Sequence, residues 1–213
     1  MTDAGYEEMS QAEILTGSVG WQRSLPANIK FRDKPMRDIS DLAVWTLSSC
    51  KPGYGVHELL NDSVDKYWQS DGPQPHTVTV EFQRKTDVSF LFLYLDYKND
   101  ESYTPSKIVV KTGSSLQTLE NTVSVTFHEP SGWQRIDLRD SNIDPARVMV
   151  VHLQVVQNHQ NGRDTHIRHI RVTGPSTSRF CAEARLIAGD PIRDFKTENF
   201  DMKQIMLSAM SIR

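Results

Sequence analysis

The densest group of side chains suited to chemistry lies in one polar segment of the chain, residues 158–166. It contains Asn158, His159, Gln160, Asn161, Gly162, Arg163, Asp164, Thr165 and His166. Amide and imidazole groups both donate and accept hydrogen bonds, and a guanidinium adds charged donors. This composition suits recognition of peptide backbone, of amide groups or of sugar hydroxyls. The Asn-Gly pair at 161–162 is also a turn signal, so a solvated loop is the alternative interpretation.

Three other polar connections could present side chains beside this one: residues 48–55, 67–76 and 96–106. The second of them contains Ser70, Asp71 and an Asp-Gly turn signal. Trp45 and Trp68 flank these connections, and we expect both to anchor the core or its rim rather than to stack on a ligand.

Catalytic chemistry has little support in the sequence. The chain has no Gly-x-Ser-x-Gly elbow, no phosphate-binding glycine-rich loop and no His-Glu-x-x-His motif. Cys50 has no recognisable partner base, and we expect it to be a buried structural thiol. Asp71, Asp100 or Asp164 could serve a glycosidase only if the fold placed two carboxylates within a few ångströms of each other.

Metal binding is equally unsupported. His166 and His169 lie three positions apart and would face opposite sides of a strand, and no cysteine near them or His159 completes a zinc site. Asp96, Asp100 and Glu101 lack the spacing of an EF-hand loop. We expect no metal and no cofactor.

The elements that must position these loops are strands, because apolar residues recur with a period of two. About eight short strands are predicted, at 43–48, 76–82, 89–97, 107–111, 122–128, 133–138, 148–156 and 166–172. No helical stretch is long enough for repeated crossovers, which argues against a parallel sheet. The prediction is an all-β fold, an antiparallel β-sandwich of jelly-roll type. Its core should contain Val78, Val80, Leu91, Leu93, Val151, Leu153, Ile170 and Val172.

Composition excludes several functional classes. The 213 residues include 24 Lys and Arg against 27 Asp and Glu, a net charge of -3, which does not favour nucleic-acid binding. No apolar run is long enough to span a bilayer, and no signal peptide is recognisable. Cys50 and Cys181 are the only cysteines, which favours free thiols in a reducing, intracellular compartment.

The ends of the chain differ from its middle. Residues 1–38 show no persistent period and are predicted to be a partly disordered or peripheral extension, which Trp21 could anchor. Residues 39–174 form the predicted sandwich. Residues 175–213 are predicted to be a tail, with a helical turn near 202–207, and end in Ile212-Arg213.

Four blocks of this sequence closely resemble the Doc domain of the anaphase-promoting complex, a ubiquitin ligase. They are WTLSSCKPG at 45–53, YWQSDG at 67–72, DESYTPSKI at 100–108 and NHQNGRDTH at 158–166. They occur in order across residues 40–172. The resemblance implies a galactose-binding-like jelly roll, which agrees with the strands derived independently from periodicity.

The resemblance also implies a non-catalytic role. Doc-domain subunits act with a propeller-shaped WD40 coactivator as co-receptors for the destruction-box degron, and they raise the processivity of ubiquitin transfer in mitosis. By this resemblance the degron-binding residues are Asn158, His159, Gln160, Asn161, Arg163, Asp164 and His166, with Ser70 and Asp71 on a neighbouring loop.

The resemblance extends to the partners of the chain. Ile212 and Arg213 match the family's terminal Ile-Arg pair, which docks on a tetratricopeptide-repeat scaffold subunit. The expected partners are therefore other subunits of the complex, the coactivator and destruction-box substrates, with no nucleic acid and no membrane. The expected location is the nucleus and cytoplasm.

Two rival functions remain open from the sequence. A carbohydrate-binding module could use the same sandwich, with Trp68 stacking on a sugar. A hydrolase could use Asp71, Asp100 or Asp164.

Overall fold

The computed structural model describes residues 13–15, 30–31, 34–61, 63, 65–140 and 144–176. The predictions about Trp21, Cys181, the turn near 202–207 and the terminal Ile212-Arg213 lie outside these residues. No helix within the described ranges is long and apolar enough to cross a membrane.

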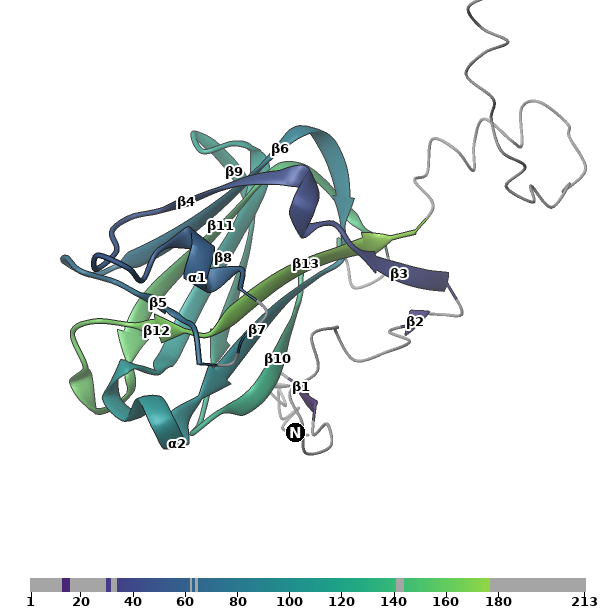
Figure 1. Cartoon of the computed structure of the whole chain (residues 1–213). Helices are drawn as coiled ribbons and strands as arrows, with labels where there is room; N and C mark the ends of the chain where they lie inside the picture. The colour runs from purple at the N-terminus through teal and green to yellow at the C-terminus, as the bar shows by residue number, and fades with distance from the viewer. Residues whose placement is uncertain are drawn as a thin grey trace, which may run out of the picture. The chain divides into compact units, whose positions relative to one another are not determined.

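Two antiparallel sheets face each other in this part of the chain (Figure 1). The six-stranded sheet has the order β1 (Glu13–Leu15), β10 (Ser131–Asp137), β7 (Phe90–Asp96), β13 (His169–Pro175), β3 (Lys34–Asp38) and β2 (Lys30–Phe31). The five-stranded sheet has the order β4 (Ala43–Leu47), β6 (His76–Val88), β11 (Ala146–Asn158), β8 (Pro105–Ser115) and β9 (Thr118–Thr126). A small third sheet pairs β5 (Trp68–Gln69) with β12 (His166–Ile167). The predicted antiparallel β-sandwich is confirmed.

Helices are few and short, and they lie in the connections between strands. They are α1 (Val56–Leu59), α2 (Tyr97–Asp100) and the 3-10 turns η1 (Ser40–Leu42), η2 (Glu101–Tyr103) and η3 (His159–Asn161). In Figure 1, α2 lies at the same end of the sandwich as β5 and β12.

The core lies between the sheets and follows the period of two. Val78, Val80 and Phe82 on β6 are buried, as are Leu91 and Leu93 on β7. All eight predicted core residues are buried, including Val151, Leu153, Ile170 and Val172. Burial of these apolar side chains is the main force that holds the two sheets together.

The other face of β7 is also covered, which explains its nearly continuous apolar run. Phe90, Phe92 and Trp133 form a second buried cluster, with Met36 and Tyr94 packed against it. The ring of Trp133 meets those of Phe92 and Tyr94 edge to face, at 6.5 and 5.4 Å between centroids. β7 is therefore covered on both faces.

Several boundaries differ from the sequence prediction. β6 continues through residues 83–85 to Val88, although their exposed polar side chains break the apolar period. The strand predicted at 166–172 is divided at Arg168, whose backbone N–H donates to the Tyr94 carbonyl at 3.2 Å. Three strands fall within the predicted extension 1–38, and β3 pairs with β13 at the edge of the core sheet.

Candidate functional site

Four connections meet at one end of the sandwich, at residues 48–55, 67–76, 96–106 and 158–166; we call this the loop end. Ser70 links two of them. Its backbone N–H donates to the Thr165 carbonyl at 3.1 Å, and its side-chain oxygen accepts from the Thr165 N–H at 2.9 Å. These contacts continue the pairing of β5 with β12. The structure thus places Ser70 and Asp71 beside residues 158–166, as predicted.

Asn158 shapes the 158–166 loop from inside. It is 1% exposed, and its amide donates to the carbonyls of Gly162 and Asp164 at 3.2 and 2.8 Å. Gly162 packs so tightly on the neighbouring loop that a Cβ there would lie 1.8 Å from the Ser102 carbonyl oxygen. Any larger residue at 162 would force the two loops apart.

His159 joins the loop to two further segments. Its Nδ1 donates to the Thr104 carbonyl at 3.0 Å, and its Nε2 accepts from the Glu129 N–H at 3.3 Å. Both ring nitrogens are therefore engaged within the chain, as a neutral imidazole allows. His159 holds the loop in position rather than presenting a group to a ligand.

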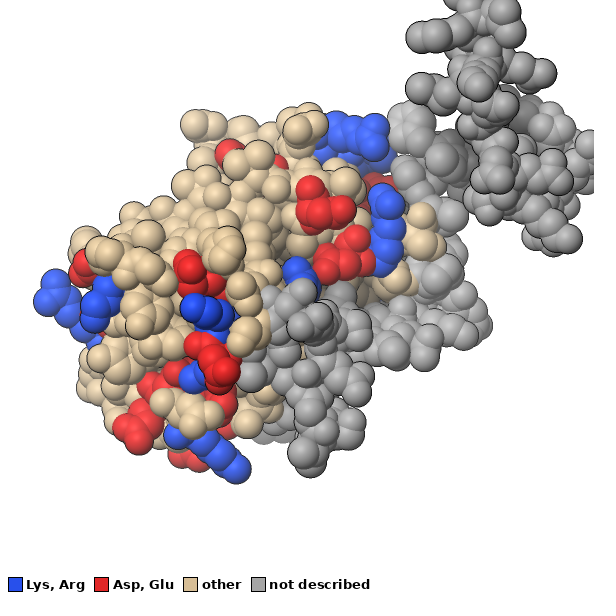
Figure 2. All heavy atoms as spheres, in the orientation of Figure 1, with Lys and Arg blue, Asp and Glu red and all other residues tan. Residues whose placement is uncertain are grey.

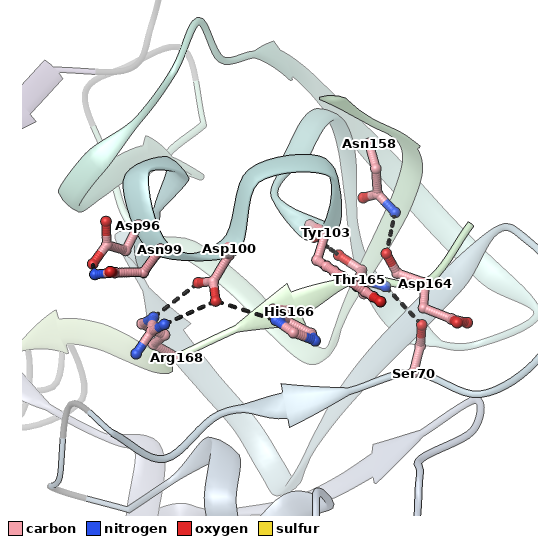
Figure 3. Close-up of polar contacts among 10 residues, drawn as sticks. All are labelled: Ser70, Asp96, Asn99, Asp100, Tyr103, Asn158, Asp164, Thr165, His166 and Arg168. Carbon is pink, nitrogen blue, oxygen red and sulfur yellow. Dashed lines mark hydrogen bonds and ion pairs between the residues drawn. The ribbon is translucent and has the colours of Figure 1, made fainter. Parts of the chain in front are cut away.

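Asp100 is the electrostatic centre of the loop end (Figure 3). Arg168 donates to both of its carboxylate oxygens at 2.8 Å, and His166 Nδ1 donates to Oδ1 at 3.1 Å. Burial alone would raise the pKa of Asp100, but the hydrogen bonds from His166 and Arg168 outweigh it and the pKa is lowered. In turn, Asp100 raises the pKa of Arg168 against the opposing effect of burial.

Aromatic rings enclose this polar centre. Tyr103 stacks on the His166 ring at 4.2 Å between centroids, and Tyr67 lies at 4.3 Å from it. The guanidinium of Arg168 lies 5.6 Å from the centre of the Tyr67 ring, within the range of a cation–π contact. The pKa of Tyr67 is raised, first by burial and then by its hydrogen bond with Tyr54. His166 is thus held by Asp100 and two rings.

The nine predicted binding residues divide into two groups. Asn158, Ser70 and His166 are buried, and His159 is committed to internal hydrogen bonds. The residues with side chains at the surface are Gln160, Asn161, Arg163 and Asp71, with Asp164 partly buried. Figure 2 shows acidic and basic side chains intermixed at this end of the molecule. A ligand would therefore meet a mixed polar surface without a single sign of charge.

The apex of the loop is held in an uncommon backbone conformation. Gln160 and Asn161 have φ of 51° and 56°, in the left-handed region, and the Gln160 amide donates to the Tyr97 hydroxyl at 3.1 Å. Two consecutive residues of this kind turn the chain sharply and point their side chains outward.

Sequence reasoning did not identify the residues that support this surface. Asp100 appeared only as a candidate acid, and Arg168, Tyr67 and Tyr103 were not singled out. Tyr67, the pair Asp100 and Tyr103, and Arg168 lie in three separate segments, and only the fold brings these segments together around His166. A buried charge needs a partner, but its place in the sequence does not identify that partner.

One sequence prediction is wrong and another is confirmed. Cys50 is exposed, because it lies in the connection that leaves β4 and not on a strand facing the core. Trp68 is fully buried and its Nε1 donates to the Ser49 carbonyl at 2.9 Å, so it is the expected anchor and cannot stack on a sugar.

Among the described residues, no group of three His, Cys, Asp or Glu side chains could hold a metal ion.

The sandwich and its clustered end loops define the class of fold, a galactose-binding-like jelly roll. The family 32 carbohydrate-binding module of C. perfringens NanJ, solved with galactose, superposes with a TM-score of 0.54 over 65% of this chain and 98% of that one, at 11% identity. A two-module structure from ZmpB of Clostridium perfringens, solved with GalNAc, gives a TM-score of 0.52 over 66% and 35%, at 12% identity. At such low identity, these likenesses concern the fold alone.

The family follows from sequence comparison. The model of the family described as "Anaphase-promoting complex, subunit 10 (APC10)" matches residues 10–200, and the chain belongs to this family. The Homo sapiens subunit 10 is 49% identical over 144 residues, which cover 68% of this chain and 78% of that protein. The Caenorhabditis elegans protein is 35% identical over 185 residues, covering 86% and 84%. Subunit DOC1 of Saccharomyces cerevisiae is 34% identical over 143 residues, covering 66% and 57%. The resemblance inferred from four sequence blocks is confirmed.

Proposed function

We propose that this chain is a non-catalytic subunit of an anaphase-promoting complex whose loop end serves as a co-receptor for the destruction-box degron. The observation that carries the proposal is the arrangement of the 158–166 loop. Internal hydrogen bonds of Asn158, His159 and Ser70 hold this loop in place, while Asn161, Arg163 and Asp71 stay exposed at the loop end.

Such a surface suits an extended peptide. The main chain of a bound segment offers amide donors and carbonyl acceptors, and the Asn161 amide can pair with either. Arg163 supplies a charged donor and Asp71 a charged acceptor, and neither side chain makes a hydrogen bond within the described part of the chain. Because the loop is already ordered, binding costs less conformational entropy than it would on a flexible segment.

Three exposed polar groups provide only weak affinity by themselves. The proposal therefore includes a second receptor, the WD40 coactivator, which shares the degron and raises the effective concentration at this site. Other subunits hold the chain in the complex, and the terminal Ile212-Arg213 docks on a tetratricopeptide-repeat scaffold. The chain would act wherever this complex acts, in the nucleus and cytoplasm.

A hydrolase is less well supported by this geometry. The carboxylate of Asp100 is bound by Arg168 and His166, and its lowered pKa keeps it ionised, which does not suit a general acid. The carbohydrate alternative depended on Trp68 as a stacking platform, and this side chain is buried.

The test is single-encounter ubiquitination by complex reconstituted with a loop variant. Asn161→Gly, Arg163→Ala and Asp71→Ala together remove the three exposed groups, and glycine accepts the positive φ at position 161. Loss of about 1 kcal/mol of binding energy should make substrate dissociation roughly fivefold faster. We expect shorter ubiquitin chains per encounter and an unchanged rate of the first transfer.

The matched control replaces three exposed residues on β6, away from the loop end: Gln83, Arg84 and Lys85, each by Ala. The control should retain wild-type processivity. Wild-type chain length from the fully incorporated loop variant would refute the proposal.

A further inference from the structure

A second surface suited to a partner lies along β9. This strand ends the five-stranded sheet, and its outer edge pairs with no strand among the described residues. Its nine residues, Thr118–Thr126, contain one charged side chain, Glu120, and neither Lys nor Pro. Edge strands usually carry charged residues, especially Lys, or Pro. These residues prevent the free N–H and C=O groups of the edge from pairing with another extended chain. The edge of β9 is therefore open to strand addition.

A cavity of about 270 Å³ adjoins this edge. Its walls come from β8, β9 and the residues that follow β10: Val110, Thr112, Asn121, Thr122, Val123, Leu138, Arg139 and Asp140. Small-molecule sites usually exceed about 300 Å³, so this cavity is better matched to one long side chain than to a free ligand.

An unpartnered hydroxyl lies in the cavity wall. Thr112 is 2% exposed, and its Oγ1 has no hydrogen-bond partner within the described ranges. It stands opposite Asn121 in the pairing of β8 with β9. The Asn121 amide donates to Asp140 Oδ1 at 3.1 Å, which leaves the Asn121 carbonyl oxygen able to accept. A buried hydroxyl without a partner is costly, and a donor entering the cavity would satisfy it.

The charges of the wall favour a cation. The guanidinium of Arg139 is matched by Asp137, with Nε donating to Oδ1 at 2.8 Å, and it lies 4.9 Å from the centre of the Phe90 ring. Because Asp137 neutralises Arg139, the carboxylate of Asp140 gives the cavity lining a net negative charge. The apolar part of the wall, from Val110, Val123 and Leu138, suits the methylene stem of a lysine.

We infer that β9 binds an extended segment of a partner protein by strand addition and that a lysine of this segment enters the cavity. Main-chain hydrogen bonds along the edge provide affinity, and the cavity provides selectivity. Thr112 lies seven residues beyond Pro105, about 23 Å along β8 at roughly 3.3 Å per residue, so the cavity is separate from the loop end.

The experiment uses the full chain labelled with 15N and three synthetic ten-residue peptides of alternating Thr and Val. They differ only at one central position, which is Lys, norleucine or Glu. We expect NMR chemical-shift changes of backbone amides confined to β8, β9 and residues 138–140. The lysine peptide should bind about tenfold more tightly than the norleucine peptide.

Two variants test the role of the cavity. Asp140→Asn and Thr112→Val should each remove most of the preference for lysine while leaving norleucine binding unchanged. Ser124→Lys, an exposed substitution on β9, should weaken all three peptides by protecting the edge. The loop variant Asn161→Gly, Arg163→Ala, Asp71→Ala should bind like wild type, which separates this inference from the proposed function.

Three outcomes would overturn the inference. They are no binding of the lysine peptide at millimolar concentration, equal affinity for the three peptides, and shift changes outside β8, β9 and 138–140. Edge-to-edge self-association seen by sedimentation, abolished in Ser124→Lys, would instead assign the edge to a second copy of the chain and would also overturn it.

Discussion

Replacing Asp100 by Asn tests whether one buried carboxylate holds the loop end together. The side chain of Asp100 is 4% exposed and that of its partner Arg168 is 13% exposed. Asparagine preserves the size of the group but removes its charge and one acceptor oxygen. The guanidinium of Arg168 then remains mostly buried without its counter-ion, and His166 loses its hydrogen bond from Nδ1.

The magnitude follows from the cost of an uncompensated charge. Removal of one partner from a fully buried ion pair costs about 3–5 kcal/mol. Arg168 keeps some contact with solvent and asparagine keeps one acceptor, so we expect a smaller loss, about 2–3 kcal/mol of unfolding free energy. Urea unfolding followed by circular dichroism and tryptophan fluorescence measures this loss.

The pH dependence provides an independent check. The folded-state pKa of Asp100 is lowered, so its contribution to stability is complete above the unfolded value of about 3.9 and disappears as pH falls through the folded value. Asp100→Asn should therefore differ from wild type by a constant amount between pH 5 and 8. The two proteins should begin to converge in stability below about pH 4 and become equal once the pH has fallen below the folded-state pKa of Asp100.

The double variant Asp100→Asn, Arg168→Gln is the matched control, because it removes both charges. Its loss of stability should be smaller than the sum of the two single losses by about 2 kcal/mol. A single-variant loss below about 0.5 kcal/mol, or strict additivity of the two changes, would refute the assigned role of the pair.

Two further predictions concern the core and the tail. Leu153→Ala, at a fully buried position on β11, should cost about 2–5 kcal/mol in urea unfolding, and a loss below about 0.5 kcal/mol would be inconsistent with that burial. Deletion of Ile212 and Arg213 should reduce, but not abolish, co-immunoprecipitation with the repeat scaffold while leaving the unfolding curve unchanged; wild-type recovery would argue against docking through the tail.

Much of the fold was predictable from local pattern. Alternation at Val78, Val80 and Phe82, and the apolar run around Leu91 and Leu93, each place a strand relative to the core, because successive side chains of a strand face opposite sides. The ends of strands were less predictable. β6 continues through the exposed polar residues 83–85, which lie at a register shift between the pairing of Glu81 with Val150 and that of Thr86 with Val148. An irregularity of this kind leaves no apolar period in the sequence to mark it.

The candidate site was only partly predictable. The nine residues proposed from sequence do gather at one end, but sequence did not separate those that support the loop from those that face solvent. Asn158 and Asn161 are the same residue type, three positions apart. One is 1% exposed and binds two carbonyls, while the other lies at the exposed apex.

The sequence by itself determined the fold class, the main core positions, the family and the polar loop, because periodicity and local motifs are properties of neighbouring residues. Only the tertiary structure decided that Asp100 pairs with Arg168 and His166, that Trp68 is buried, that Cys50 is exposed and that a cavity lies beside β9. These features depend on residues brought together from distant parts of the chain. Burial and charge compensation act on distances in space, which separation along the sequence does not specify.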